Sequence, residues 1–349
     1  AFFRNVEIET TKCPIGIASA RASIARCDDL IKGGSFLAAN RAMAIDIKQR
    51  YPMARILIAG CGDVGIELGV RLTQAGHTVW GLRRHYDTLP SSVHAFPADL
   101  TKPETLSALP PALDVVFYTA APSSSSADNY RATYVDGMRH LLTALVAQGH
   151  KVQRFVFTSS TGVYAQEAGE WVDETSPTEP VHFSGRELLA AEHEVLNSAF
   201  PATVVRLAGI YGPGRTRLID SVRKGTAVCT DGPPVYTNRI HRDDCAGVLL
   251  HVMKLPQPDR LYLAVDHEPA DQCVVLSWLA LQLGLPPPRK ETATAAQNSL
   301  QRSNKRCRNN KLIESGYVFR YPTFREGYSA LLTTRPTLGF LHQCRTGPR

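Results

Sequence analysis

The chain lacks the sequence features of several protein classes. It has no apolar run near the roughly 18 residues that a membrane-spanning helix requires. Its cysteines form no CxxC pair and show no spacing typical of a metal site; they lie at positions 13, 27, 61, 229, 245, 273, 307 and 344. We therefore expect no membrane span, no metal site, and reduced thiols in a cytoplasmic protein.

Charge of one sign is not concentrated in any segment. The 349 residues include 39 Lys and Arg and 32 Asp and Glu, which gives a formal net charge of +7. Only 20% of the residues are charged and 44% are hydrophobic, as in a globular protein with a sizeable core. Because the basic residues are scattered and are not interleaved with aromatics, the sequence does not predict nucleic-acid binding. The positive balance favours a small anionic ligand.

The strongest positive signal is an apolar run that ends in a GxGxxG motif. Residues 55–59 predict a strand, and Gly60, Gly62 and Gly65 follow it at once. In dinucleotide-binding folds the first glycine permits a tight turn and the second lets backbone N–H groups approach the pyrophosphate. The third permits close packing of the following helix on the strand. Three glycines would also fit an ordinary turn, so the flanking sequence has to decide.

The flanking sequence supports the dinucleotide interpretation. Residues 64–75 have the apolar spacing of a helix that Gly76 ends, and residues 77–82 predict a second strand. The order of strand, glycine turn, helix and strand therefore predicts a cofactor site. Its first residues would be Gly60, Cys61, Gly62, Asp63, Val64 and Gly65.

The residues after the second strand indicate which cofactor binds. An NAD site usually carries an acidic residue there, which binds the ribose 2′-hydroxyl, whereas arginine accommodates a 2′-phosphate. Here Arg83 and Arg84 occupy the position. Each charge-assisted hydrogen bond to a phosphate is worth about 1.5–3 kcal/mol. The sequence thus predicts NADP (NADPH) in preference to NAD, the alternative being a solvated basic turn.

Strand and helix signals alternate through the middle of the chain. Strands are predicted at residues 94–100, 114–119, 154–159 and 202–207, and a helix at residues 129–148. Such alternation predicts an α/β fold with a Rossmann-type, doubly wound parallel sheet. Ligands in these sheets bind beyond the carboxyl ends of the strands.

Six short motifs in order resemble the extended short-chain dehydrogenase/reductases, which include the NAD-dependent sugar-nucleotide epimerases and dehydratases. They lie at residues 99–100, 119–121, 159–164, 173–180, 206–215 and 239–244, and the resemblance covers about residues 54–332. It implies that Asp99 and Leu100 border the adenine and that Ala120 and Ala121 border the nicotinamide-side ribose. It also implies that the Ser160 hydroxyl orients the substrate carbonyl or alcohol.

The chain departs from this family at two places. Ala59 replaces the first glycine of the usual GxxGxxG motif, a change that should leave cofactor binding intact. The catalytic YxxxK pair is missing, because alignment on Glu192 places Ser184 at the tyrosine and Leu188 at the lysine. Loss of such a proton-transfer group lowers a rate by about 10²–10⁴. The chain therefore resembles an atypical branch of the family.

Other residues could replace the missing proton donor. Besides Ser160, the candidates are Tyr164, four residues further on, and His182, two residues before Ser184; Arg186 could stabilise an alkoxide or a phosphate. Each also has a structural interpretation, since Tyr164 could be a packing residue and His182 and Arg186 solvated surface residues.

The substrate side is expected mainly in residues 209–332, which would form a smaller C-terminal region. Arg215, Arg239 and His241 are the candidate substrate-binding residues, because arginine suits bidentate recognition of a diphosphate. Each arginine alone could also be a surface charge. Asp243 is the expected N-cap of the helix that follows.

The sequence predicts three segments of the chain and two alternative classes of function. We expect residues 1–52 to be an N-terminal extension outside the core, residues 53–332 to form the NAD(P)-binding domain, and residues 333–349 to be a tail. The first function is an oxidoreductase or epimerase/dehydratase acting on a nucleotide sugar or a related small carbonyl or alcohol. The second is a non-catalytic NADPH-binding sensor or scaffold, which the missing pair would explain. A homodimer is the expected assembly.

Overall fold

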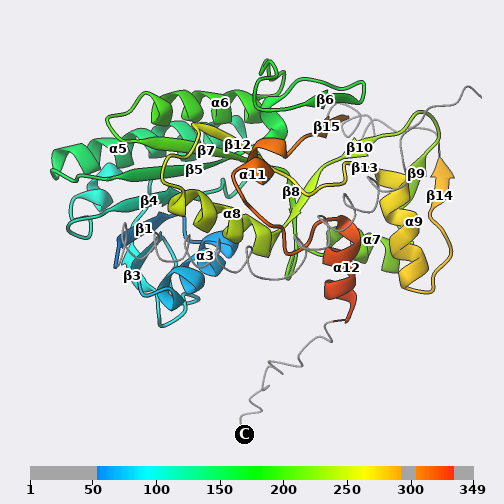
Figure 1. Ribbon diagram of the computed structural model, residues 1–349, viewed down its shortest axis with the longest axis horizontal. Helices are drawn as coiled ribbons and strands as arrows, with labels where there is room; N and C mark the ends of the chain where they lie inside the picture. The colour runs from blue at the N-terminus through cyan, green and yellow to red at the C-terminus, as the bar shows by residue number, and fades with distance from the viewer. Residues whose placement is uncertain (1–52, 292–303, 334–349) are drawn as a thin grey trace, which may run out of the picture. The chain divides into compact units, whose positions relative to one another are not determined.

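The computed structural model describes residues 53–291 and 304–333, so the predicted extension and nearly all of the predicted tail lie outside the described residues. A parallel seven-stranded sheet forms the centre, in the order β12-β7-β5-β4-β1-β2-β3 (Figure 1). Its strands are β1 (Arg55–Ala59), β2 (Thr78–Arg83), β3 (His94–Pro97), β4 (Val115–Tyr118), β5 (Arg154–Ser160), β7 (Ala202–Leu207) and β12 (Leu261–Ala264). This order confirms the predicted doubly wound sheet.

Helices cover both faces of the sheet. Helices α3 (Asp63–Gln74) and α8 (Arg242–Lys254) pack together on one face, and α5 (Gly137–Ala147) and α6 (Phe183–Leu196) on the other (Figure 1). The chain crosses from β3 past β1 to β4, so the strand order reverses between β1 and β4. This reversal is where a parallel sheet opens a crevice for a ligand.

The structure confirms the bounds of some predicted elements and corrects those of others. β1 and β7 have the predicted bounds, whereas β3 ends at Pro97, three residues early. The helix predicted at residues 129–148 consists of α4 (Ala127–Tyr130), a π-helical segment η2 (Arg131–Asp136) and α5. Strand β12 was not predicted; it forms the edge of the sheet and pairs with β7.

The C-terminal half adds short strand pairs and a second core. The pairs are β6 (Glu170–Val172) with β15 (Lys305–Cys307), β8 (Gly209–Tyr211) with β11 (Arg239–His241), β9 (Val228–Thr230) with β14 (Arg289–Glu291), and β10 (Tyr236–Thr237) with β13 (Ala270–Asp271). The remaining helices are η1 (Pro103–Leu106), η3 (Thr161–Val163), α7 (Arg217–Arg223), α9 (Gln272–Gln282), α11 (Asn310–Glu314) and α12 (Phe324–Thr333). Ile219, Leu276, Leu279 and Phe324 are buried together in this second core, as expected for a smaller C-terminal region.

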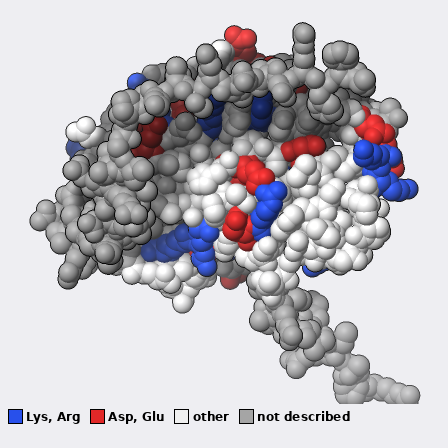
Figure 2. Space-filling view, turned by 45° about the vertical axis from the view of Figure 1, so that its right-hand side comes forward, with Lys and Arg blue, Asp and Glu red and all other residues white. Residues whose placement is uncertain are grey.

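The described part of the chain carries charges of both signs on its surface. Basic and acidic side chains lie next to one another in the middle of the face drawn in Figure 2. Within residues 53–291 and 304–333, no helix is long and apolar enough to cross a membrane, and no cluster of His, Cys, Asp or Glu could hold a metal ion. The thiols of Cys61, Cys229, Cys245, Cys273 and Cys307 are free.

Candidate cofactor and substrate site

The glycine motif forms a tight turn between β1 and α3. Gly60 has a φ of +84°, and a Cβ atom there would lie 2.2 Å from the Cα atom of Ala120. At Gly65 a Cβ atom would lie 3.0 Å from the side chains of Ile58 and Thr119. The first glycine is thus needed for backbone conformation and close approach, and the third for packing of the helix on the sheet, as predicted.

The N-terminus of α3 offers free backbone donors. Gly62 precedes the helix and provides no side-chain cap, and the first N–H in α3 with a helical partner is that of Ile66, which donates to Gly62. Among the described residues, the N–H groups of Asp63, Val64 and Gly65 have no backbone acceptor. Together with the positive end of the helix dipole, these groups suit a pyrophosphate.

A cavity of about 500 Å³ lies at the carboxyl ends of the strands, where the strand order reverses. Most of the predicted cofactor-binding residues line it, together with Ser160 and Arg215. The predicted residues that line it are Gly60, Gly62, Asp63, Val64, Arg83, Arg84, Asp99, Leu100, Ala120, Ala121, Ser160 and Arg215. Cys61 and Gly65 do not line it, because Cys61 is buried in the core and Gly65 faces the sheet.

The basic end of β2 borders one side of the cavity. Arg83 donates from Nη1 to the backbone oxygen of Cys61 at 3.2 Å and to Thr88 Oγ1 at 3.0 Å, whereas Arg84 is exposed. Asp99 follows β3, the neighbour of β2 in the sheet, and accepts from the backbone and hydroxyl groups of Thr101. Partial burial raises the pKa of Asp99, but the Thr101 hydrogen bonds and the positive charges of Arg84 and Lys102 outweigh it, so the pKa is lowered overall.

Ser160 also lines the cavity and is the last residue of β5. Its Oγ accepts a hydrogen bond from the Gly162 N–H at 3.0 Å, so the hydroxyl proton can point to a ligand. The neighbouring Ser159 is buried and donates to Glu192 Oε1 at 2.5 Å. Both serines line the cavity, and Ser159 is also anchored to Glu192.

Tyr164 takes part in a buried network instead of the cavity lining. Its hydroxyl donates to the backbone oxygen of Asp173 at 2.7 Å and accepts from Arg206 Nη1 at 2.8 Å. Burial raises the pKa of Tyr164, although Arg206 opposes this shift. The geometry favours the packing interpretation of this residue.

The start of α6 holds Ser184 and Leu188, where the sequence analysis predicts the catalytic pair to be missing. His182 and Arg186 are exposed, and Arg186 donates to the backbone oxygen of Val181 at 2.8 Å. Ser184 is half-buried and Leu188 is buried. No residue of α6 lines the cavity, so His182 is not brought to Ser160 in the part of the chain that the structure describes.

The structure adds lining residues that the sequence interpretation missed. Asn129, Thr133 and Tyr134 reach the cavity from α4 and η2, and Thr158 reaches it from β5. The helical periodicity of residues 129–148 was visible, but the π-helical turn that sets the direction of Tyr134 was not. A single wider turn leaves no distinct pattern in the sequence.

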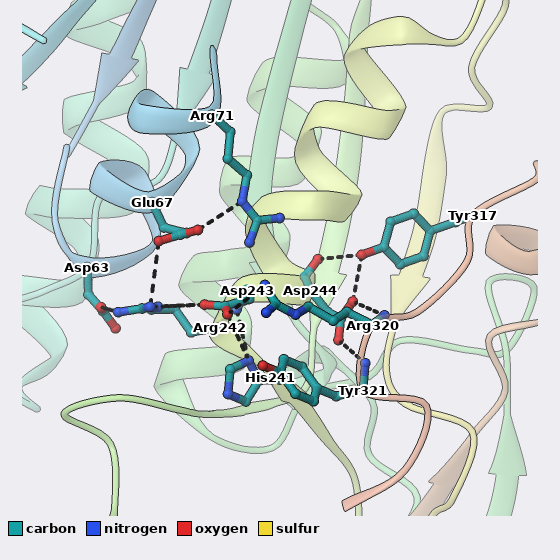
Figure 3. A network of polar contacts seen from close by, with 10 residues as sticks. All are labelled: Asp63, Glu67, Arg71, His241, Arg242, Asp243, Asp244, Tyr317, Arg320 and Tyr321. Carbon is teal, nitrogen blue, oxygen red and sulfur yellow. Dashed lines mark hydrogen bonds and ion pairs between the residues drawn. The ribbon is translucent and has the colours of Figure 1, made fainter. Parts of the chain in front are cut away.

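Arg215 is held over the glycine turn by an ion pair with Asp63, whose Oδ2 lies 2.6 Å from Arg215 Nε. Arg242 approaches the other Asp63 oxygen at 3.5 Å and also pairs with Glu67 and Asp243 (Figure 3). These contacts join the cofactor helix α3 to α8. They bring a predicted cofactor residue and a predicted substrate residue together.

The same network continues into the C-terminal segment. The Asp244 carboxylate accepts from the Tyr317 hydroxyl at 2.8 Å and from the backbone N–H groups of Arg320 and Tyr321 at 2.8 and 2.9 Å (Figure 3). Burial raises the pKa of Asp244, and these hydrogen bonds oppose the shift. The segment before α12 is thus tied to the helix that packs on the cofactor motif.

Arg239 and His241 do not line the cavity. Arg239 is buried, donates to Thr237 Oγ1 and lies over the Phe324 ring. The Nδ1 atom of His241 accepts from the Asp243 N–H at 3.2 Å, so His241 caps α8 and the prediction of Asp243 as the N-cap was wrong. Burial lowers the pKa of His241 to about 4 although Asp243 opposes the shift, which keeps the ring neutral near pH 7.

Comparison with known proteins agrees with this geometry. Protein YeeZ of Escherichia coli K12 is 28% identical over 284 residues, covering 77% of this chain and 97% of that protein. A solved structure from Methylobacillus flagellatus, named for the NAD-dependent epimerases and dehydratases, is 38% identical, covers 80% of this chain and 98% of its own, and has a TM-score of 0.67. Human dTDP-D-glucose 4,6-dehydratase is 25% identical over 164 residues, 43% of this chain and 47% of that protein. The sequence profile of the NAD dependent epimerase/dehydratase family matches residues 56–261. With more than half of its length matched, the chain belongs to the NAD-dependent epimerase/dehydratase family.

Proposed function

We propose that this protein is an NADPH-dependent oxidoreductase or epimerase/dehydratase acting on a nucleotide sugar or a related small carbonyl or alcohol. The observation that carries the proposal is the cavity at the strand reversal, which runs from the free N–H groups of α3 to the Ser160 hydroxyl. The residues fit the cofactor, since they offer a pyrophosphate site at one position and a hydroxyl donor at another. A dTDP-sugar dehydratase among the relatives supports a nucleotide sugar as the substrate class.

Arg215 fits the substrate side of this proposal. It lines the cavity and is 45% exposed, so its guanidinium can turn from Asp63 toward a diphosphate. Arg239 and His241 would act indirectly, by holding β11 and the start of α8 in place. The homodimer, the domain bounds and the cytoplasmic location stay predictions.

A non-catalytic NADPH sensor is the second candidate. It is favoured by one observation, that α6 contributes no proton-donating side chain to the lining among the described residues. The two candidates agree on cofactor binding and differ on hydride transfer. We expect transfer to occur.

The deciding experiment supplies NADPH with 9,10-phenanthrenequinone, and separately NAD with UDP-glucose or dTDP-glucose, and follows nicotinamide absorbance and sugar products. Oxidation of NADPH, or a new sugar product, would support the enzyme. Micromolar NADPH binding with no transfer to any of these compounds would favour the sensor. Failure to bind either cofactor would reject both candidates.

NADPH preference should depend on the two arginines after β2. We expect Arg84→Ser combined with Arg83→Ser to weaken NADPH binding at least tenfold more than NADH binding, because each lost charge-assisted hydrogen bond is worth about 1.5–3 kcal/mol. Calorimetric titration of both cofactors measures the two affinities. The control is Arg223→Ser, an exposed arginine on α7 outside the cavity, which should change neither. Equal wild-type affinities for NADH and NADPH would contradict the assignment.

A further inference from the structure

We propose that Tyr134 is the proton donor of this protein in the reduction of a carbonyl, in place of the side chain that α6 does not supply. This inference rests on the proposed function and assigns its missing catalytic residue. Tyr134 lies in η2, on a segment of chain about 50 residues before the position where the family carries its tyrosine.

The position of Tyr134 supports this assignment. It lines the same cavity as Ser160, Thr158 and Asn129, and its ring contacts Phe157 of β5 edge-on at 6.3 Å between centroids. Ser160 is three residues further along β5 from Phe157, at the end of that strand. Tyr134 and Ser160 thus line one cavity, from η2 and from the end of β5.

The Tyr134 hydroxyl also supports this assignment. Among the described residues, no hydrogen bond involves the Tyr134 hydroxyl. Tyr118 and Tyr164, by contrast, donate to the backbone oxygens of Thr133 and Asp173. A half-buried tyrosine hydroxyl that faces a cavity and has no protein partner is available to a ligand.

The local backbone explains why Tyr134 points this way. Residues 131–136 form a π-helical turn, in which each residue advances by less than 100° and side chains are redirected relative to an α-helix. Such turns are costly and occur often at functional sites. The same segment packs against α6, and Tyr130 contacts Phe183 edge-on at 5.3 Å. Tyr134 therefore comes from the helix beside the vacated position on α6.

The Tyr134 hydroxyl carries the proton that this step needs. Burial raises the pKa of Tyr134, and Tyr130 adds to the shift, so the hydroxyl stays protonated near neutral pH. A protonated phenol can give a proton but cannot accept one. In the reduction of a carbonyl the phenol gives this proton, and the reverse oxidation starts from the tyrosinate.

NADPH is the reductant in this step. When bound, NADPH supplies a hydride to the carbonyl carbon. The electron pair of the carbon–oxygen π bond moves to the oxygen, which takes the proton of the Tyr134 hydroxyl while Ser160 holds that oxygen by a hydrogen bond. The tyrosinate then regains a proton from water at the mouth of the cavity, and the alcohol and NADP leave.

An NMR experiment observes the Tyr134 side chain whether or not the protein turns over a substrate. Protein labelled with ζ-¹³C-tyrosine gives one NMR resonance per ordered tyrosine, and the resonance lost in Tyr134→Phe is that of Tyr134. We expect this resonance to shift when NADP is added and to stay at the protonated position from pH 6 to pH 9. The resonance lost in Tyr130→Phe is the matched control, because Tyr130 neighbours Tyr134 at 5.6 Å but does not line the cavity.

Kinetics with 9,10-phenanthrenequinone as the probe complete the test. Single-turnover oxidation of bound NADPH should slow by about 10²–10⁴ in Tyr134→Phe, with an unchanged NADPH Kd, and should change less than twofold in Tyr130→Phe. If NADP binds and the Tyr134 resonance does not move, or if Tyr134→Phe reduces the probe at the wild-type rate, Tyr134 is not the donor. If no cofactor binds to the folded wild type, the proposed function itself fails.

Discussion

Replacing Gly60 with alanine should destabilise the protein by about 2–5 kcal/mol and weaken NADPH binding more than tenfold. An alanine at a φ of +84° is strained by about 1–2 kcal/mol. The added Cβ would also lie 2.2 Å from the Ala120 Cα and 2.4 Å from its backbone nitrogen, and a backbone cannot rotate away as a side chain can. Strand β1 and the loop after β4 must therefore separate, at a cost of about 1–3 kcal/mol.

The effect on the cofactor follows from the same movement. Gly60 and Cys61 both donate from their backbone N–H groups to Leu82 at 3.0 Å, which holds the turn against the end of β2. Displacement of the turn shifts the free N–H groups of α3 away from the pyrophosphate position. Urea unfolding measures the first effect and calorimetric titration with NADPH the second.

Gly76→Ala is the matched control for the Gly60 variant. Gly76 follows α3 with a φ of +93°, so alanine is strained there as well, but no atom lies within 4 Å of the added Cβ. We expect a loss of only about 1–2 kcal/mol and unchanged NADPH affinity. Equal effects of the two substitutions would mean that backbone strain alone, and not close approach to Ala120, determines the requirement for glycine.

Replacing Arg206 with methionine should cost about 3–5 kcal/mol of unfolding free energy, because it leaves a buried carboxylate without its positive partner. The side chains of Arg206 and Glu192 are only 6% and 3% exposed. They form two parallel hydrogen bonds, of 2.9 Å from Nε to Oε1 and 2.6 Å from Nη2 to Oε2. Chemical denaturation compares the variant with the wild type.

Two further variants separate the ion pair from packing. Arg139→Met removes the partner of Glu194, also on α6, but this pair is 50% and 32% exposed, so its loss should change the stability little. The double variant Arg206→Met with Glu192→Leu should recover much of the lost stability, because it removes the uncompensated charge. A double variant as unstable as Arg206→Met would show that lost packing is responsible.

The Arg206 network also positions the site. Arg206 donates to Tyr164, and Glu192 accepts from Ser159, the residue next to Ser160. Its loss should therefore lower turnover through the position of Ser160 as well as through stability. Tyr164 serves this network, which explains how a residue four positions after Ser160 can be near the site without lining it.

The sequence by itself determined the sheet and the cofactor end of the site. These features are local: an apolar strand, a glycine at a fixed turn and an amphipathic helix each leave a periodic or positional pattern within about 25 residues. For this reason the bounds of β1 and β7, the role of Gly60 and the presence of Arg83 and Arg84 at the cavity could be predicted. The assignment of Ser184 and Leu188 to the positions of the catalytic pair also comes from the sequence alone and stays a prediction.

Only the tertiary structure decided which polar side chains reach the cavity. Tyr164 and Arg239 had the expected positions in the chain, but buried partners turn them into the core. Tyr134 gave no signal, because its direction depends on one π-helical turn and on packing between η2 and α6. Arg215 meets Asp63 across 152 residues. Side-chain direction at such positions results from contacts between distant segments, and those contacts form only when the sheet and its helices are assembled.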